Sequence, residues 1–358
     1  MHARDRSAVP PAGMRRRAAL SAITAMLATA ARADSADEWS LFRSRFVTEE
    51  GRLVDTGNDG VSHSEGQGWG LIFAAAFGDR PTFDRILAWT QRVLKRPADH
   101  LHAWRFRPGA TNPIEDPNNA TDGDLYIAFG LLMAHTRWRH AAYRDLAITI
   151  GHDLLRLTLR QHEGRPVLLP GAAGFESPAG TVLNPSYIVL PAYAALAEAM
   201  PGQRWNRLAR EGIEVLRRAR FGAWGLTPDW VLLPRTRGAG LQLPAAWPPR
   251  FSFDAVRTPL ALAWAGQLSH PALLGAHAFW SDGRWTVPPA WVDLVTGHTA
   301  DYAAPPGMLA IAAFAAARIA GNGATVTLPS INVSRDYYSA SLTLLTRVAC
   351  EATATRFG

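Results

Sequence analysis

The chain has 358 residues, of which 48% are hydrophobic and 19% charged, and its formal net charge is +7. Six arginines and a single acid lie within residues 1–33, so the rest of the chain carries a formal charge of only +2. A nucleic-acid or anionic-membrane partner therefore loses most of its electrostatic support. The length and composition suit one large core or two modest domains.

The first 33 residues have the pattern of an export signal. Arg15-Arg16-Arg17 precedes an apolar run over 18–30, and Ala31-Arg32-Ala33 supplies an A-x-A cleavage pattern. The apolar run is too short to span a bilayer. We therefore expect a signal peptide over 1–33 and a mature chain in the periplasm or secreted, without a membrane span. The paired arginines allow a twin-arginine route, but the partial pattern favours general secretion.

Cofactor motifs are missing from the sequence. There is no H-E-x-x-H or C-x-x-C motif, the histidines are scattered, and no G-x-G-x-x-G follows a strand pattern. We therefore expect no metal and no nucleotide cofactor. The single cysteine, Cys350, excludes an internal disulfide, and its apolar helical surroundings predict a buried structural thiol.

Helical patterns recur along most of the chain. Trp39, Phe42 and Phe46 have a helical spacing that ends near Gly51. Further helices are predicted over 68–77, 82–96, 123–137, 141–159, 187–199, 205–219, 255–268, 307–320 and 337–352. Long loops separate them at 98–120, 165–184, 221–252 and 279–306, with short hairpin strands near 167–169 and 230–233. Because no crisp repeat and no linker is evident, we predict one all-α domain over 34–358.

The segment 62–70 carries the most unusual chemistry in the chain. It combines one carboxylate, Glu65, with two serines, a histidine and three glycines, directly before an apolar helix pattern. A carboxyl at the mouth of a packed helix and beside Trp69 is desolvated, which favours its protonated, proton-donating form. The alternative is a helix start in which Ser62 or Ser64 caps and Glu65 only complements the helix dipole.

Two further acidic clusters precede predicted helices. Asp122 and Asp124 lie at the start of the helix predicted over 123–137, and Asp254 directly precedes the helix predicted over 255–268. Asp122 and Asp254 are also plausible N-caps. Arg257 lies three residues after Asp254 on the same helical face, and a neighbouring cation lowers the pKa of a carboxyl.

Paired carboxyls in opposite protonation states are what glycosidic bond cleavage requires. One protonated carboxyl donates to the leaving oxygen, while an ionised one activates water or attacks carbon. Glu65 suits the acid and Asp254 the ionised partner. If the pair inverts the anomeric carbon, the two carboxyls should stand roughly 6.5–9.5 Å apart.

Several segments together resemble glycoside hydrolase family 8. Residues 120–128 read Ala-Thr-Asp-Gly-Asp-Leu-Tyr-Ile-Ala, similar to the family signature A-[ST]-D-[AG]-D-x-x-[IM]-A. Supporting matches, in chain order, are Ser64-Glu65-Gly66, Leu168-Leu169-Pro170-Gly171, Asn184-Pro185-Ser186-Tyr187, Pro228-Asp229-Trp230 and Phe253-Asp254-Ala255-Val256-Arg257. The similarity runs from about Trp39 to Tyr338 and is strongest to the periplasmic endoglucanases associated with bacterial cellulose synthase.

This resemblance implies an all-α (α/α)6 barrel with short β hairpins in its loops, and an inverting endo-β-1,4-glucanase. Carried onto matching positions, Glu65 is the general acid, Asp254 the general base, and an aspartate of the Asp122/Asp124 pair, preferably Asp122, holds the distorted sugar. The remaining substrate-binding candidates are Asp124, Tyr187 near the attacking water, Arg257 near the base, Trp69, and Trp104 as a stacking platform. Phe253 departs from the family, which often has Tyr there.

Other functions stay open at this point. The expected partner is a β-1,4-glucan, with the cellulose synthase complex as a further candidate partner. The same chemistry would also serve xylan, chitosan or mixed-linkage glucan. A glucan-binding accessory that does not cut is a different class of function, and an α/α barrel of the cyclase or lyase kind would lack opposed carboxylates.

Overall fold

The computed structural model describes residues 37–321 and 326–354, and the predicted signal peptide over 1–33 lies outside them. Residues 37–46 are helical. The helices that follow are α2 (Ser64–Phe77), α3 (Arg80–Val93), α4 (Thr121–Trp138), α5 (Ala141–Leu157), α6 (Leu190–Ala199), α7 (Trp205–Arg218), α8 (Arg257–Trp264), α9 (Pro271–Trp280), α10 (Pro306–Ala320) and α11 (Tyr337–Ala354).

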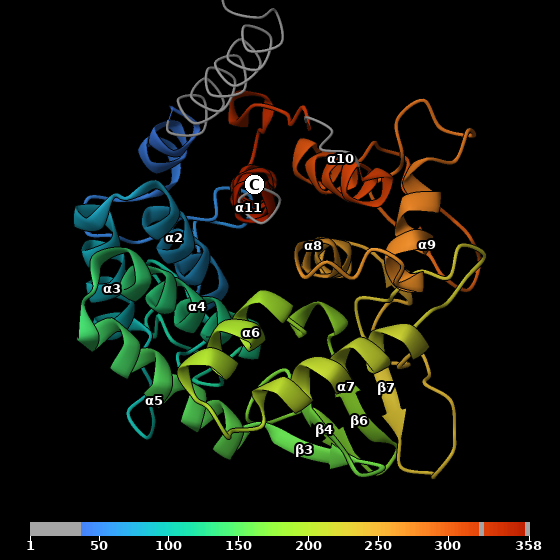
Figure 1. Cartoon of the computed structure of the whole chain (residues 1–358), viewed down its shortest axis with the longest axis horizontal. Coiled ribbons are helices and arrows are strands. Elements are labelled where there is room, and N and C mark those ends of the chain that lie inside the picture. Colours follow the sequence, from blue (N-terminus) through green and yellow to red (C-terminus); the bar gives the residue numbers. More distant parts are fainter. Residues whose placement is uncertain (1–36, 322–325, 355–358) are drawn as a thin grey trace, which may run out of the picture.

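The helices form two concentric layers (Figure 1). In the inner layer α2, α4, α6, α8, α10 and α11 follow one another, and α11 returns to pack against α2. Outside them, α3 packs against α2, α5 against α4, α7 against α6 and α9 against α8. The chain thus forms the predicted (α/α)6 barrel.

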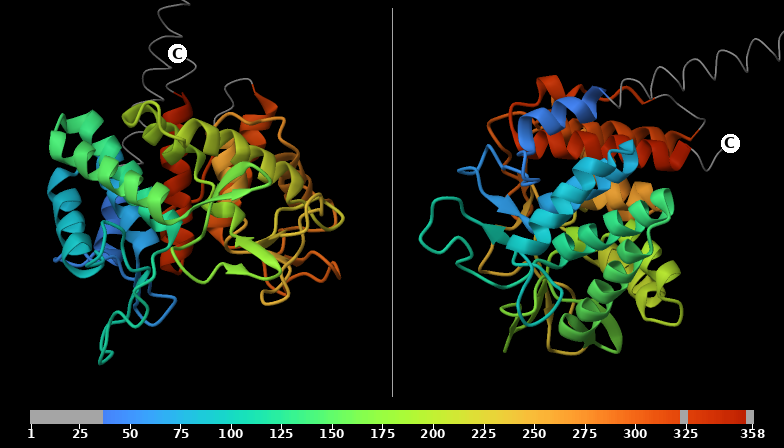
Figure 2. Two further views of the ribbon diagram at one scale, coloured as in Figure 1. Left: turned by 90° about the horizontal axis from the view of Figure 1, so that it is seen from below. Right: turned by 90° about the vertical axis from the view of Figure 1, so that its left-hand side faces the viewer.

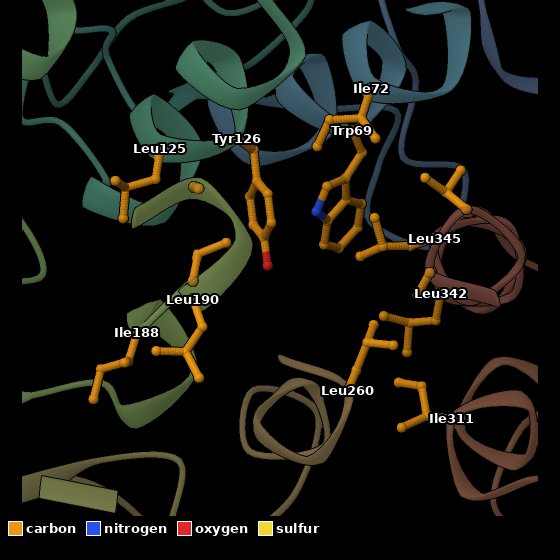
Figure 3. Packing of buried hydrophobic residues seen from close by; sticks show 14 of the residues in the cluster. Trp69, Ile72, Leu125, Tyr126, Ile188, Leu190, Leu260, Ile311, Leu342 and Leu345 are labelled. Atoms are coloured by element: carbon orange, nitrogen blue, oxygen red, sulfur yellow. The ribbon is translucent and has the colours of Figure 1, made fainter. Parts of the chain in front are cut away.

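The barrel interior is filled by apolar side chains from the inner helices. Figure 3 shows Trp69 and Ile72 from α2, Tyr126 from α4, Leu260 from α8 and Leu345 from α11 converging on one another. One continuous cluster of buried apolar residues extends from the N-terminal helical segment to α11. Burial of this kind stabilises a fold by about 25 cal/mol per Å² of apolar surface.

Short β-strands lie within the loops between the helices. β1 (Ser62–His63) pairs with β2 (Arg105–Phe106), β3 (Leu159–His162) with β4 (Arg165–Leu168), and β8 (Arg250–Phe251) with β9 (Val292–Asp293). A three-stranded antiparallel sheet has the order β5 (Glu176–Ser177), β6 (Gly180–Leu183), β7 (Val231–Pro234). The predicted strand near 167–169 is therefore β4, whereas the one near 230–233 pairs with a distant strand rather than in a local hairpin.

Several predicted boundaries needed correction. α9 was missed, because it has only ten residues and is apolar on nearly every side, which leaves no helical period to detect. The helix predicted from 187 begins at Leu190, after the 3-10 turn Pro185–Tyr187. The helix predicted over 255–268 covers only 257–264. Cys350, predicted to be buried, is half-buried, and burial raises the pKa of its thiol to about 12.

The N-terminal ends of the inner helices meet at one end of the barrel. Arg257, the first residue of α8, contacts the first turns of α2 and α4, and Tyr338 near the start of α11 reaches the turn before α8. The strands and long loops gather at this same end (Figure 2). Because helix N-termini carry partial positive charge, this end is suited to anionic side chains.

Substitution of Gly68 tests the close contact of α2 with α4. A Cβ at this position would lie 2.5 Å from the Tyr126 Cβ and 2.8 Å from the Ile127 amide nitrogen. We expect Gly68→Ala to lower the free energy of unfolding by about 1–3 kcal/mol, because α2 and α4 must move apart. Gly240→Ala is the control, since nothing lies within 4 Å of its Cβ position. Equal unfolding midpoints for both variants in urea would contradict this account.

Candidate active site

One buried guanidinium lies at the centre of the candidate site. Arg257 is 3% exposed, and its Nη1 contacts Glu65 Oε1 and donates to Asp122 Oδ2 at 3.0 Å. Its Nη2 donates to Asp254 Oδ1 at 2.6 Å and to Ser186 Oγ at 3.0 Å. Three carboxylates far apart in the sequence thus converge on one cation.

The backbone explains how Glu65 reaches this position. His63 in β1 pairs with Arg105 in β2, and the Ser64 amide donates to the Trp104 carbonyl at 3.0 Å, so α2 begins against the loop 98–120. Gly123 then allows α2 and α4 to touch, since a Cβ there would lie 2.7 Å from the Glu65 nitrogen. The glycine between Asp122 and Asp124 therefore brings Glu65 and Asp122 together.

Asp122 and Asp124 lie in different surroundings. Asp122 faces Arg257, and its Oδ1 accepts from the Gly123 amide at 2.8 Å. Asp124 is fully buried; its Oδ1 accepts from the His102 amide at 3.0 Å and lies 2.8 Å from His102 Nδ1, while its Oδ2 accepts from Asn119 at 3.0 Å. Asp124 therefore ties the loop 98–120 to α4. Asp122, which is also buried, shares Arg257 with Glu65 and Asp254, and this favours Asp122 as the third carboxylate of the site.

Burial controls the proton affinity of the site carboxyls. Desolvation raises the pKa of Asp254 to about 6, against a smaller opposing effect of the hydrogen bond from Asn184. Burial, and after it the neighbouring Asp254, raises the pKa of Asp122 well above the ordinary aspartate value. Because one guanidinium cannot neutralise three carboxylates, the cluster retains protons. Glu65 and Asp254 remain 21% and 34% exposed, so both can be reached from solvent.

Three tyrosines surround the carboxylates. The Arg257 guanidinium carbon lies 5.8 Å from the centre of the Tyr187 ring, and burial followed by Asp122 raises the pKa of that phenol. Burial also raises the pKa of Tyr126 and Tyr338, so these phenols remain neutral. Tyr338 donates to the Phe253 carbonyl next to Asp254. Sequence reasoning missed Tyr338, because it lies more than 80 residues beyond that carboxylate with no motif that links them.

The two predicted tryptophans differ in their access to solvent. Trp69 is 0% exposed and packs edge-on against Tyr126, with ring centroids 5.8 Å apart. It has no free face for a sugar, contrary to its predicted substrate contact, and supports the start of α2 instead. Trp104 is half-buried beside the site, with its ring parallel to that of His63 at 6.0 Å and its Nε1 donating to Asp116 at 2.9 Å.

An aromatic cluster that was not predicted lies near Tyr187. The Trp230 ring is parallel to those of Phe175 and Trp247, with centroid distances of 5.9 and 5.2 Å, and lies 6.3 Å from the Tyr187 ring. All three rings of the cluster are half-buried and come from loops. The many tryptophans of the sequence were the available signal, but nothing in it showed which of them cluster.

A fourth carboxyl, that of Asp229, binds the backbone on either side of Asp254. Its Oδ1 accepts from the Ser252 and Ala255 amides at 3.1 and 2.8 Å. Burial, and after it the nearby Asp254, raises the pKa of Asp229 to about 8. The sequence signalled this residue only as part of Pro228-Asp229-Trp230.

The described residues contain neither a group suited to hold a metal ion nor a helix suited to span a membrane. Across 37–321 and 326–354, no group of three His, Cys, Asp or Glu side chains is arranged to hold a metal ion. No helix in that part of the chain has the length and hydrophobicity to cross a bilayer.

Known proteins share this fold and sequence over most of the chain. Residues 12–351 match the family model described as Glycosyl hydrolases family 8. A probable endoglucanase of Novacetimonas hansenii is 41% identical over 314 residues, covering 88% of this chain and 90% of that protein. An endoglucanase of Cellulomonas uda is 38% identical over 299 residues, covering 82% of each chain.

Structural comparison agrees with these matches. The endo-beta-1,4-glucanase CMCax from Acetobacter xylinum superposes with a TM-score of 0.84 at 41% identity, covering 89% of this chain and 99% of that one. Such identity over nearly the whole length of both proteins goes beyond a shared fold. The chain therefore belongs to glycosyl hydrolases family 8.

Proposed function

We propose that this protein is an endo-β-1,4-glucanase that cleaves internal bonds of cellulose chains with inversion at the anomeric carbon. The observation that carries the proposal is the contact of Arg257 with Glu65, Asp122 and Asp254 at one end of the barrel. The similarity to proteins named endoglucanase supports β-glucan as the substrate.

Glu65 acts as the general acid in this proposal. Its carboxyl lies in the first turn of α2 and is partly open to solvent. Within the described residues it forms an ion pair only with Arg257, which also contacts Asp122 and Asp254. In this role the protonated form of Glu65 donates to the leaving oxygen.

Asp254 acts as the general base. With a pKa of about 6 it is mostly ionised at neutral pH yet basic enough to take a proton from water. Arg257 contacts Glu65 with Nη1 and Asp254 with Nη2, so both carboxyls face the same guanidinium. The separation expected for inversion is roughly 6.5–9.5 Å, with space for the attacking water.

The remaining groups bind and orient the sugar chain. Asp122, with Arg257 fixing its carboxylate, holds the ring whose bond is cleaved, and Tyr187 lies beside the water position. Trp104 and the cluster of Phe175, Trp230 and Trp247 offer aromatic surfaces on either side of the carboxylates. Flat aromatic faces suit the apolar faces of β-linked glucose rings and tolerate sliding of a long chain.

We also propose that the enzyme works in the periplasm or outside the cell. The arginine-rich start, the apolar run over 18–30 and the Ala31-Arg32-Ala33 pattern support export and cleavage after Ala33. A role beside a cellulose synthase complex follows from the resemblance of the sequence to glucanases of that kind.

Digestion of cellohexaose tests substrate and stereochemistry together. We expect internal cleavage, with the α-anomer of the new reducing end appearing first in a proton NMR spectrum, because water attacks the face opposite the leaving group. Parallel digests of xylan, chitosan and mixed-linkage glucan separate the alternatives within the family. Binding of cellohexaose without any cleavage would instead support a glucan-binding accessory.

Replacement of the Glu65 carboxyl by an amide should greatly slow turnover. We expect Glu65→Gln to lower kcat by about 10²–10⁴-fold, because the amide fills the same space but cannot donate as an acid. Glu49→Gln, at an exposed position away from the site, is the matched control. Initial rates on cellohexaose are the measurement, with circular dichroism to verify folding. A folded Glu65→Gln enzyme at the control's rate would remove Glu65 from the acid role.

The pH dependence of kcat/KM should report Asp254. Because its pKa is raised to about 6, the base takes up a proton at higher pH than an ordinary aspartate does. We expect kcat/KM to be lost as the pH falls through about 6, approaching tenfold per pH unit below it. Rates on cellohexaose between pH 4 and 8 measure this limb. A midpoint near 4, the ordinary range of an aspartate, would contradict a titrating base with a raised pKa.

A further inference from the structure

The proposed base stands on a short turn rather than on a regular element. β8 ends at Phe251 and α8 begins at Arg257, so residues 252–256 carry Asp254 between them. Within the turn, the Val256 amide donates to the Ser252 carbonyl at 3.1 Å and the Arg257 amide to the Asp254 carbonyl at 3.1 Å. These bonds leave the Ser252 and Ala255 amides for other partners.

Asp229 supplies that partner from a distant loop. Ser252 is 8% exposed and Ala255 0%, so their amides are poorly accessible to water and need an acceptor from the protein. A single oxygen, Asp229 Oδ1, accepts from both, at 3.1 and 2.8 Å. The two amides flank Asp254 in the sequence, so this one carboxyl holds the backbone on both sides of the base.

The loop that carries Asp229 is itself well held. The Asp229 amide donates to the Arg250 carbonyl at 2.8 Å, which joins the loop to β8. The next residue, Trp230, lies within the aromatic cluster between Phe175 and Trp247. Tyr338 also donates to the Phe253 carbonyl, so two side chains from distant segments hold the turn that carries the base.

We propose that Asp229 is a positioning residue for the reaction, which fixes the Asp254 turn by accepting hydrogen bonds from the amides on both sides of the base. This inference rests on the proposed function and adds a residue to it. Asp229 makes no contact with the reacting atoms in this role. It acts through Asp254, whose carboxylate must point at a water molecule with little freedom.

The protonation of Asp229 suits this role. Burial and the nearby Asp254 raise its pKa to about 8, so the carboxyl is neutral at neutral pH while Asp254 is ionised. The other ionisable groups near Asp254 include Arg257, Asp122 and the phenols of Tyr187 and Tyr338. A neutral carboxyl and an amide have the same shape and both present a carbonyl-type acceptor, so asparagine is a faithful substitute.

A set of Asp229 variants separates positioning from general stability. We expect Asp229→Ala to lower kcat on cellohexaose about 100-fold with KM changed less than about threefold, because displacement of a catalytic group by about 1 Å has an effect of this size. Asp229→Asn should restore kcat to within about threefold of wild type. Asp229→Ser, too short to reach both amides, is the second variant should alanine prevent folding, and it should behave like alanine.

Asp79→Ala is the matched control. Asp79 also joins separate segments, through bonds from Trp39, Arg43 and the Thr82 amide, but it lies at the start of α3, away from the site. We expect it to lower the unfolding temperature while kcat stays at the wild-type value. A purely structural Asp229 would give the same result as this control.

Hydrogen exchange provides a readout that does not depend on activity. Measured by mass spectrometry, peptides that cover 251–256 should exchange faster in Asp229→Ala or Asp229→Ser than in wild type, and Asp229→Asn should restore protection. Wild-type kcat in a folded alanine or serine variant, or a loss in Asp229→Asn as large as theirs, would overturn the inference. Failure of the proposed function is distinguishable, since the wild-type enzyme would then not cleave cellohexaose at all.

Discussion

The contact of a single buried guanidinium with three carboxylates is the constraint on which the site depends. A buried cation is costly unless it is fully paired, and Arg257 is paired only when α2, α4 and α8 are in place together. The converse also holds, because three carboxylates cannot all be neutralised by one positive charge. The same contact therefore positions the three carboxylates and favours the protonated form of some of them.

The barrel explains why such a cluster can exist. Inner helices that run in a ring bring their N-termini to one end, where the backbone amides favour negative charge. α2, α4, α8 and α11 contribute Glu65, Asp122, Arg257 and Tyr338 to that end, and the outer helices pack against the inner ones. Small residues such as Gly123 allow the closest contacts, so the positions of the carboxylates are determined by backbone packing and not by flexible side chains.

Glu65, Asp254 and Arg257 were candidates because each lies in a short motif at a helix start, and the structure brings the three together. Sequence reasoning also predicted the fold class, from the repeated helical periods. It failed where a role depends on contacts across the barrel. Nothing local distinguishes Asp122 from Asp124, since the distant residues His102 and Asn119 bind Asp124 and leave Asp122 to face Arg257. Trp69 beside Glu65 suggested a sugar contact, and only packing against Tyr126 shows a buried ring. Asp229 and Tyr338 were missed for the same reason.

The packing of α11 against α2 has a consequence for the folding of the enzyme during its synthesis on the ribosome. Glu65, Asp122 and Asp254 have all been translated long before Tyr337–Ala354, yet the ring cannot close without that last helix and its Tyr338. Contacts between segments nearly three hundred residues apart make closure a late and slow event. A nascent chain is therefore unable to cut glucan, and hydrolytic competence arises only once synthesis of the final inner helix is finished.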